Sequence, residues 1–145
     1  MNFSALLERC SCCPRNCNVN RLKNELGFCK IGINPKISAF NLHFGEEPPI
    51  SGSSGSGTIF FTGCNLKCAF CQNYPISQLH NGNEVTVSKL AEVMISLQNQ
   101  NAHNINLVTP THVVVQIIEA LLLAKKKGLT IPIVYNSGGY EKVEM

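Results

Sequence analysis

Charge is scarce in this sequence, since only 14% of its 145 residues are Asp, Glu, Lys or Arg. The 12 basic residues are scattered and leave a net charge of +3. There is no polybasic stripe of the kind that binds nucleic acid by neutralising phosphates, so we expect no nucleic-acid partner. The hydrophobic content of 44% still allows a buried core, and the length is that of one ordinary domain.

Long apolar segments are also missing. Residues 1–9 have neither the basic n-region nor the apolar h-region of a signal peptide, and we therefore expect a cytoplasmic protein. The longest apolar stretch, residues 113–124, is interrupted by Gln116 and Glu119 and is shorter than the ~20 residues that cross a bilayer. It predicts a buried helix and no membrane partner.

Cysteine, by contrast, is abundant, with eight residues. The cytosol keeps thiols reduced, so metal binding rather than disulfide formation is the default explanation. The cysteines form two groups, which indicates two separate sites. The first group is Cys10, Cys12, Cys13, Cys17 and Cys29, and the second is Cys64, Cys68 and Cys71.

From residue 58 onward, strand patterns alternate with helix patterns, which predicts an α/β fold with a parallel sheet and right-handed crossovers. Thr109 suits the N-cap of the second helix and Pro110 its first helical position, while lysines and Gly128 suit its end. The expected strands are 58–62, 104–108 and 131–135, and the expected helices run from Ser88 through Leu97 and from Pro110 to Lys127.

Two units are expected along the chain. Residues 1–50 mix cysteine, asparagine, proline and glycine with little periodicity, which predicts a loop-rich, Cys-rich segment before a core domain over residues 51–145. The last predicted strand has no following helix to cover it, although parallel sheets bury both faces. We interpret the chain as a fragment or as half of a split protein, with an exposed sheet edge that favours aggregation.

A C-x3-C-x2-C motif follows the first predicted strand directly and is formed by Cys64, Cys68 and Cys71. A [4Fe–4S] cluster normally takes four thiolates, so three leave one iron open to another ligand. The alternative is a zinc site, or a structural cluster that His80 or His103 completes. The motif's place at the carboxyl end of a strand, where sites in βα folds collect, favours the open cluster.

This spacing, with an aromatic residue before the last cysteine, resembles the signature of the radical S-adenosylmethionine superfamily. The resemblance extends to relatives of pyruvate formate-lyase activating enzyme. It implies the amino-terminal half of a partial (βα)6 barrel, preceded by the Cys-rich segment. The similar segments are residues 10–21, 57–64, 71–77, 104–112 and 132–140.

The resemblance also implies a mechanism. Cys64, Cys68 and Cys71 would bind three irons, S-adenosylmethionine would chelate the fourth, and reductive cleavage would give a 5′-deoxyadenosyl radical that abstracts hydrogen from a substrate. Phe70 would pack near the adenine. Implied partners are reduced flavodoxin or ferredoxin as electron donor and either a protein substrate or a second chain that completes the barrel. Because later family regions are absent, this fragment is not expected to be active alone.

One departure concerns the end of the second strand. Many superfamily members carry Gly-Gly-Glu there to hold the methionine amino group, whereas this chain has Val-Thr-Pro-Thr at residues 108–111. The amino group would then contact backbone carbonyls or the hydroxyls of Thr109 and Thr111.

The amino-terminal cysteines suggest a second metal site, but their spacing does not determine which metal it binds. Cys10, Cys13, Cys17 and Cys29 suit a four-thiolate site that holds zinc or a second cluster, with Cys12 spare. Buried thiols without any metal are the alternative. The alternative for the whole chain is a non-catalytic iron–sulfur or zinc module that binds a partner or transfers electrons.

Overall fold

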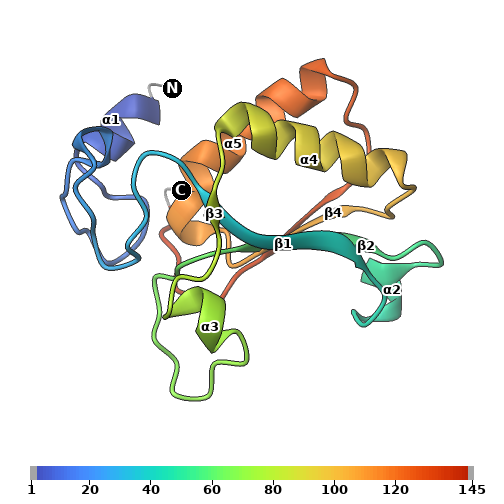
Figure 1. Ribbon diagram of the computed structural model, residues 1–145, viewed down its shortest axis with the longest axis horizontal. Coiled ribbons are helices and arrows are strands. Elements are labelled where there is room, and N and C mark those ends of the chain that lie inside the picture. The colour runs from blue at the N-terminus through green and yellow to red at the C-terminus, as the bar shows by residue number, and fades with distance from the viewer. Residues whose placement is uncertain (1–2, 144–145) are drawn as a thin grey trace.

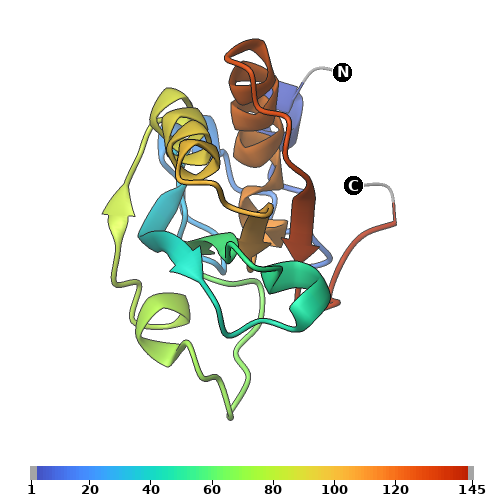
Figure 2. The same cartoon turned by 90° about the vertical axis from the view of Figure 1, so that its right-hand side faces the viewer.

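A computed structural model describes residues 3–143, whose core is an open five-stranded sheet with α4 and α5 on one face and α3 on the other (Figures 1 and 2). The strand order is β3-β1-β2-β4-β5. The elements are α1 (Phe3–Glu8), the 3-10 helix η1 (Arg21–Lys23), β1 (Lys36–His43), α2 (Pro48–Ser51), β2 (Ser56–Phe61), α3 (Tyr74–Ser77), β3 (Asn83–Glu84), α4 (Val87–Asn99), β4 (Ile105–Val108), the 3-10 helix η2 (Thr111–Val113), α5 (Val114–Lys126) and β5 (Ile133–Asn136).

The three strands expected from the sequence are β2, β4 and β5, and they pair in parallel. Ile59 lies opposite Leu107, and Leu107 lies opposite Tyr135. β2 begins two residues earlier than expected, at Ser56. The parallel arrangement aligns the carboxyl ends of all three strands at one edge of the sheet.

One face of the sheet is apolar and carries the core. Ile59 of β2 and Leu107 of β4 are fully buried with Leu90 and Met94 of α4 and with Ile117 of α5. Burying each such side chain contributes roughly 1.5–3 kcal/mol relative to leaving it in water. These contacts explain why the helical spacing of apolar residues predicted α4, because the recurring apolar positions face the sheet.

The start of α5 differs from the prediction. Thr109 does not cap a helix, because its N–H donates to the Asn136 carbonyl (2.9 Å) and continues the pairing with β5, and its φ is +59°. Pro110 precedes the 3-10 turn η2, and the α-helix begins at Val114. Strand pairing therefore outweighs the local capping preference of threonine.

The end of α5 follows the prediction. Gly128 has a φ of +96° and donates its N–H to the Lys125 carbonyl (3.1 Å). Leu129 donates to the Ala124 carbonyl (3.0 Å). This is a Schellman ending, in which glycine adopts the left-handed conformation after the last helical turn.

Residues 1–50 contain a strand that the sequence did not reveal. β1 pairs with β2 in an antiparallel arrangement, with His43 opposite Ser56. Ile37 is its single buried apolar residue, so β1 lacks the alternating pattern by which strands are recognised. The predicted boundary between residues 50 and 51 falls inside α2.

β5 is the outer strand on its side of the sheet, and its Ile133 and Tyr135 side chains are partly exposed. Across residues 3–143, no helix is both long enough and apolar enough to span a membrane.

Candidate iron–sulfur site

The three cysteines of the motif lie on a loop, residues 63–73, which we call the cluster loop. It leaves the carboxyl end of β2 and returns through α3, on the sheet face opposite α4 and α5 (Figure 1). Thr62 fixes its start, because the Thr62 N–H donates to the Lys36 carbonyl (2.9 Å) and the hydroxyl to the Asn81 carbonyl (3.0 Å). The loop therefore has a firm base at the sheet edge.

All three thiols of the cluster loop are partly exposed. The Leu66 N–H donates to Cys64 Sγ (3.3 Å), and Cys71 Sγ shares a hydrogen bond with Ser77 Oγ (3.2 Å). Burial raises the pKa of the Cys64 thiol. Hydrogen bonds to ligand sulfurs are among the features that stabilise and tune iron–sulfur clusters, so these donor groups suit a thiolate-bound cluster.

Gly63 connects β2 to the cluster loop in a place that has no room for a side chain. Its φ is +81°, and its N–H donates to the Ile76 carbonyl (2.9 Å). A Cβ at this position would lie 2.6 Å from the Cys29 carbonyl oxygen. Only glycine meets both requirements.

We expect Gly63→Ala to destabilise the chain by about 1–3 kcal/mol, because it adds a backbone clash to the strain of a positive φ. Gly128→Ala is the matched control, since Gly128 has a φ of +96° but no atom within 4 Å of an added Cβ. Urea unfolding of both variants measures the two losses. Equal losses would show that the Cys29 carbonyl does not constrain Gly63.

A groove of about 570 Å³ opens beside the cluster loop at the carboxyl ends of the parallel strands. Glu46, Thr109 and Asn136 line it, together with Gln72 and Asn73 of the cluster loop. Its volume lies within the ~300–1,000 Å³ of ordinary small-molecule sites. The lining is polar and includes one carboxylate, so the groove suits a polar or cationic ligand.

The sheet face that leads to this groove is polar although it is buried. Ser56 Oγ donates to Asn104 Oδ1 (2.7 Å), and Asn106 Nδ2 donates to Glu46 Oε1 (3.0 Å). Asn106 Oδ1 is buried and has no partner among the described residues. Buried polar groups normally find partners, so the unpaired Oδ1 is a cost of placing Asn106 where its Nδ2 holds Glu46.

Of the three residues predicted to contact S-adenosylmethionine, Phe70 and Thr111 do not line the groove. Phe70 is 86% exposed on the cluster loop. Thr111 is buried and its hydroxyl donates to the Glu141 carboxylate. Of the two threonines, Thr109 alone lines the groove.

The histidines considered as remote ligands lie in different places. His103 precedes β4, at the opposite end of the parallel strands from the cluster loop, where its Nδ1 is 3.1 Å from the Ile50 carbonyl oxygen. It is therefore not placed to complete the C-x3-C-x2-C site. His80 follows α3, and its Nδ1 is buried without a partner among the described residues.

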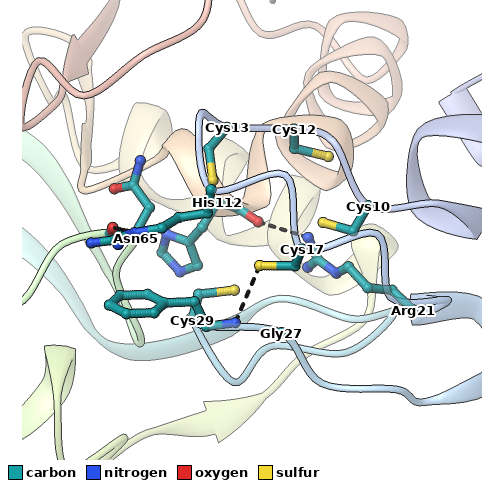
Figure 3. A pocket seen from close by; sticks show the side chains of 11 residues that line it. Cys10, Cys12, Cys13, Cys17, Arg21, Gly27, Cys29, Asn65 and His112 are labelled. Carbon is teal, nitrogen blue, oxygen red and sulfur yellow. Dashed lines mark hydrogen bonds between the residues drawn. The ribbon is translucent and has the colours of Figure 1, made fainter.

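The five amino-terminal cysteines line a second, small cavity of about 10 Å³, enough for about one water molecule (Figure 3). Arg21 and His112 also line it, as does Asn65 of the cluster loop. No local sequence pattern indicated Arg21 or Asn65 at this cavity, although an arginine within a cysteine-rich segment was a usable signal. The cysteines are Cys10, Cys12, Cys13, Cys17 and Cys29.

Electrostatics differ among these thiols. A hydrogen bond with Cys12 lowers the pKa of the Cys10 thiol to about 5, and the positive charge of Arg21 acts in the same direction. The same hydrogen bond, together with burial, raises the pKa of Cys12. Burial raises the pKa of Cys13 and of Cys29. Cys10 is thus the member of this group that most readily becomes a thiolate.

Arg15 joins the two cysteine groups. Its Nε donates to the Asn65 carbonyl (2.9 Å), directly after Cys64, and its guanidinium lies 3.8 Å from the centre of the Phe28 ring. Asn65 in turn donates to the Tyr140 carbonyl (2.8 Å). The amino-terminal segment therefore packs on the cluster loop.

Neither cysteine group is arranged around a single point. Within residues 3–143, no three His, Cys, Asp or Glu side chains stand as the ligands of one metal ion would. In a [4Fe–4S] cluster each thiolate binds a different iron, so its ligands are spread around the cube.

Comparisons with known proteins agree with the chemistry of the cluster loop. The sequence profile of a family described as "4Fe-4S single cluster domain" matches residues 50–140. A protein of Methanocaldococcus jannaschii, described as uncharacterized, is 35% identical over 148 aligned positions, which cover 96% of this chain. The chain spans 41% of the length of that relative. No solved structure matches the chain.

Proposed function

The chain belongs to the 4Fe-4S single cluster domain family, and on this basis we propose that it is part of a radical S-adenosylmethionine enzyme. Cys64, Cys68 and Cys71 hold the [4Fe–4S] cluster, and S-adenosylmethionine binds at the iron that they leave open. This assigns the chain to the pyruvate formate-lyase activating enzyme-like group. Its product is a 5′-deoxyadenosyl radical that abstracts hydrogen from a substrate.

The observation that carries the proposal is that the loop with the three thiols also lines one groove. They lie on a single loop at the carboxyl end of β2, and the groove of about 570 Å³ begins at the same edge of the sheet. Four protein ligands would close a cluster, whereas three leave a position for a small molecule. Gln72 and Asn73 directly follow Cys71 and line the groove, which connects the two features.

The chemistry divides between the cofactors and this chain. When bound and reduced, the cluster supplies the electron that cleaves the sulfonium C–S bond. Glu46 offers a negative charge to the cationic ligand, and Asn106 orients that carboxylate through Nδ2 and Oε1 (3.0 Å). Thr109 offers its hydroxyl or backbone carbonyl in place of the acidic group that other radical enzymes use there.

The fold supports the same proposal. Parallel βα units with a site at the carboxyl ends of their strands are the arrangement of βα barrels. We propose that β2, β4 and β5 form the first part of a partial (βα)6 barrel, which a further segment or a second chain completes. The uncharacterized relative is longer than the part that this chain matches, which is compatible with such a completion.

The electron is proposed to come from reduced flavodoxin or ferredoxin. The cluster loop supports this, because its thiols are partly exposed and Phe70 beside them is 86% exposed. A surface-exposed cluster loop allows a carrier protein to approach. Whether the hydrogen donor is a protein or a small molecule does not alter this step.

Electron paramagnetic resonance tests the open iron. The chain is reconstituted anaerobically with iron and sulfide, reduced, and measured with and without S-adenosylmethionine. We expect S-adenosylmethionine to change the g values of the cluster signal, because its amino and carboxylate groups become iron ligands. Adenosine, which lacks those groups, is the control and should leave the spectrum unchanged.

An identical spectrum in all three samples would refute ligand binding at the cluster. It would support the second candidate function, a non-catalytic iron–sulfur module that transfers electrons or binds a partner. The half-exposed thiols are compatible with that function as well.

A further inference from the structure

Three lysines from different segments of the chain lie close together beside the cluster loop. Lys30 follows the amino-terminal cysteines, Lys36 begins β1, and Lys67 lies inside the cluster loop. Burial lowers the pKa of His80, and the charges of these three lysines lower it further, so each of them lies near this one side chain. The fold thus gathers cations that the sequence scatters.

Backbone contacts hold these segments together around the start of the cluster loop. The Lys36 carbonyl accepts from the Thr62 N–H (2.9 Å), and the Lys30 N–H closes the turn that precedes it (3.1 Å). Phe28 lies in that turn, and Lys67 Nζ is 5.2 Å from the centre of its ring. The places from which the three side chains emerge are therefore fixed relative to one another.

Arg15 adds a fourth positive charge beside the cluster loop. Its guanidinium lies 3.8 Å from the centre of the same Phe28 ring. Arg15, Lys30 and Lys67 are exposed and Lys36 is half-buried, so the group faces solvent. We call Arg15, Lys30, Lys36 and Lys67 the basic surface.

The basic surface is not neutralised by carboxylates of the chain itself. Residues 26–45 and 48–83, which carry its three lysines, contain no Asp or Glu. Glu84 lies opposite Lys36 in the sheet, but its carboxylate accepts from Asn34 Nδ2 (2.9 Å). None of the four cations forms an ion pair within the part of the chain that the structure describes. Their charges therefore add up to a positive potential at this surface.

Phe70 adds an exposed apolar side chain to the same loop. It is 86% exposed and lies three residues after Lys67. Apolar and aromatic contacts framed by polar and charged groups are the usual composition of protein–protein interfaces. The cluster loop therefore offers both an apolar contact and a charged border to a partner protein.

We propose that the basic surface docks an acidic electron-carrier protein against the cluster loop. The inference rests on the proposed function for its electron acceptor, the cluster, and adds the surface at which the carrier binds. The carrier loses one electron and the cluster gains it, while no bond is formed or broken. Opposite charges attract the carrier to this surface and orient it, which raises the association rate by roughly 10–10³-fold.

The variant Lys30→Gln/Lys36→Gln/Lys67→Gln tests this surface. It removes three positive charges and keeps long polar side chains at the same places. Arg15 is left intact, because its Nε donates to a carbonyl of the cluster loop (2.9 Å) and its loss would disturb the loop itself. The reconstituted chain is mixed with reduced flavodoxin as the acidic carrier, and stopped-flow absorption follows reduction of the cluster.

The matched control replaces Lys125, Lys126 and Lys127 by glutamine. These lysines are exposed at the end of α5, on the face of the sheet opposite α3 (Figure 1). The control changes the net charge by the same amount, so it separates the position of the charges from their number.

We expect the second-order rate constant at low ionic strength to fall roughly tenfold in the basic-surface variant and to stay near the wild-type value in the control. The three proteins should converge at high salt, because screening removes the attraction. Their iron contents and their spectra after complete reduction by dithionite should be the same, which shows that the cluster itself is intact.

Equal rate constants for the two variants at low ionic strength would overturn the docking surface. The measurement contains no S-adenosylmethionine, so its result is separate from the test of the open iron. Slow reduction of the basic-surface variant together with a resonance that ignores S-adenosylmethionine would contradict the proposed radical enzyme alone. Equal rates together with a resonance that changes would contradict the docking surface alone.

A second measurement needs no variant and covers the case in which the triple substitution impairs cluster assembly. The rate constant of the wild-type chain with flavodoxin is measured at increasing ionic strength. We expect it to fall steadily, because the two proteins attract each other through opposite charges. A rate constant that stays level or rises would overturn the proposal.

Discussion

Cys68→Ala is expected to lower the iron content of the reconstituted chain from four atoms to none and to abolish the low-temperature resonance of the reduced cluster. Cys68 is the middle ligand of the C-x3-C-x2-C motif, and the Cys71 N–H donates to its carbonyl (3.3 Å) in the turn that holds the last two thiols. Two thiolates would remain for four irons, so the cube loses its attachment.

Cys12→Ala is the comparison for this variant, because it also removes one thiol but lies in the apolar cluster near α1. We expect Cys12→Ala to retain iron and resonance at wild-type levels. Iron analysis, visible absorption and resonance spectra of the two variants, prepared side by side, give the result. A normal cluster in Cys68→Ala would show that other residues ligate the iron.

Local sequence signals predicted the part of the fold that carries the cluster loop. The apolar run in β2, the helical spacing in α4 and the glycine after α5 each depend on residues close together in the chain. The same holds for the motif of Cys64, Cys68 and Cys71, whose position after a strand follows from the sequence alone. Such features are readable because neighbours along the chain determine them.

Features that depend on contacts between distant residues could not be predicted from the sequence. β1 is a strand because it pairs with β2, and its mostly exposed side chains leave no periodic pattern. The Thr109 prediction was wrong for a related reason, since pairing with Asn136 decides the backbone there. Tertiary hydrogen bonds outweighed local preference in both places.

The amino-terminal cysteine group shows that the residues around a site are equally hard to predict when distant contacts bring them together. Its five cysteines were identified from composition, but Arg21 became a member only through the fold. Its Nη1 donates to the His112 carbonyl, 91 residues further along the chain. No sequence pattern indicates which buried charge lies beside which thiol, although the charge of Arg21 helps to lower the pKa of Cys10.

His112 connects the two cysteine groups and makes stability depend on pH. It is buried beside the amino-terminal cavity, and its Nε2 lies 2.8 Å from the Thr62 carbonyl oxygen. A carbonyl only accepts hydrogen bonds, so Nε2 carries the proton and Nδ1 is bare. Nδ1 has no partner among the described residues. Burial, with the charge of Arg21 nearby, lowers the pKa of His112 from 6.5 to about 4.

The folded chain therefore resists protonation of His112, whereas the unfolded chain accepts the proton near pH 6.5. The contribution of neutral His112 to the free energy of unfolding is fully present above pH 6.5 and is lost as the pH falls toward 4. At about 1.4 kcal/mol for each pKa unit, the loss is roughly 3 kcal/mol. Because other groups also titrate in this range, including Cys10, the loss must be isolated by a variant.

His112→Gln provides that variant, since its amide N–H can donate to the Thr62 carbonyl but does not titrate. We expect the free energy of unfolding to fall between pH 7 and pH 4 by roughly 3 kcal/mol more in the wild-type chain than in His112→Gln. Urea unfolding of both proteins at the two pH values measures the difference, and the contributions of Cys10 and the metal-binding thiols largely cancel in the comparison. Equal pH dependence would mean that His112 is solvated or protonated in the folded chain, and the bare Nδ1 would then have a partner.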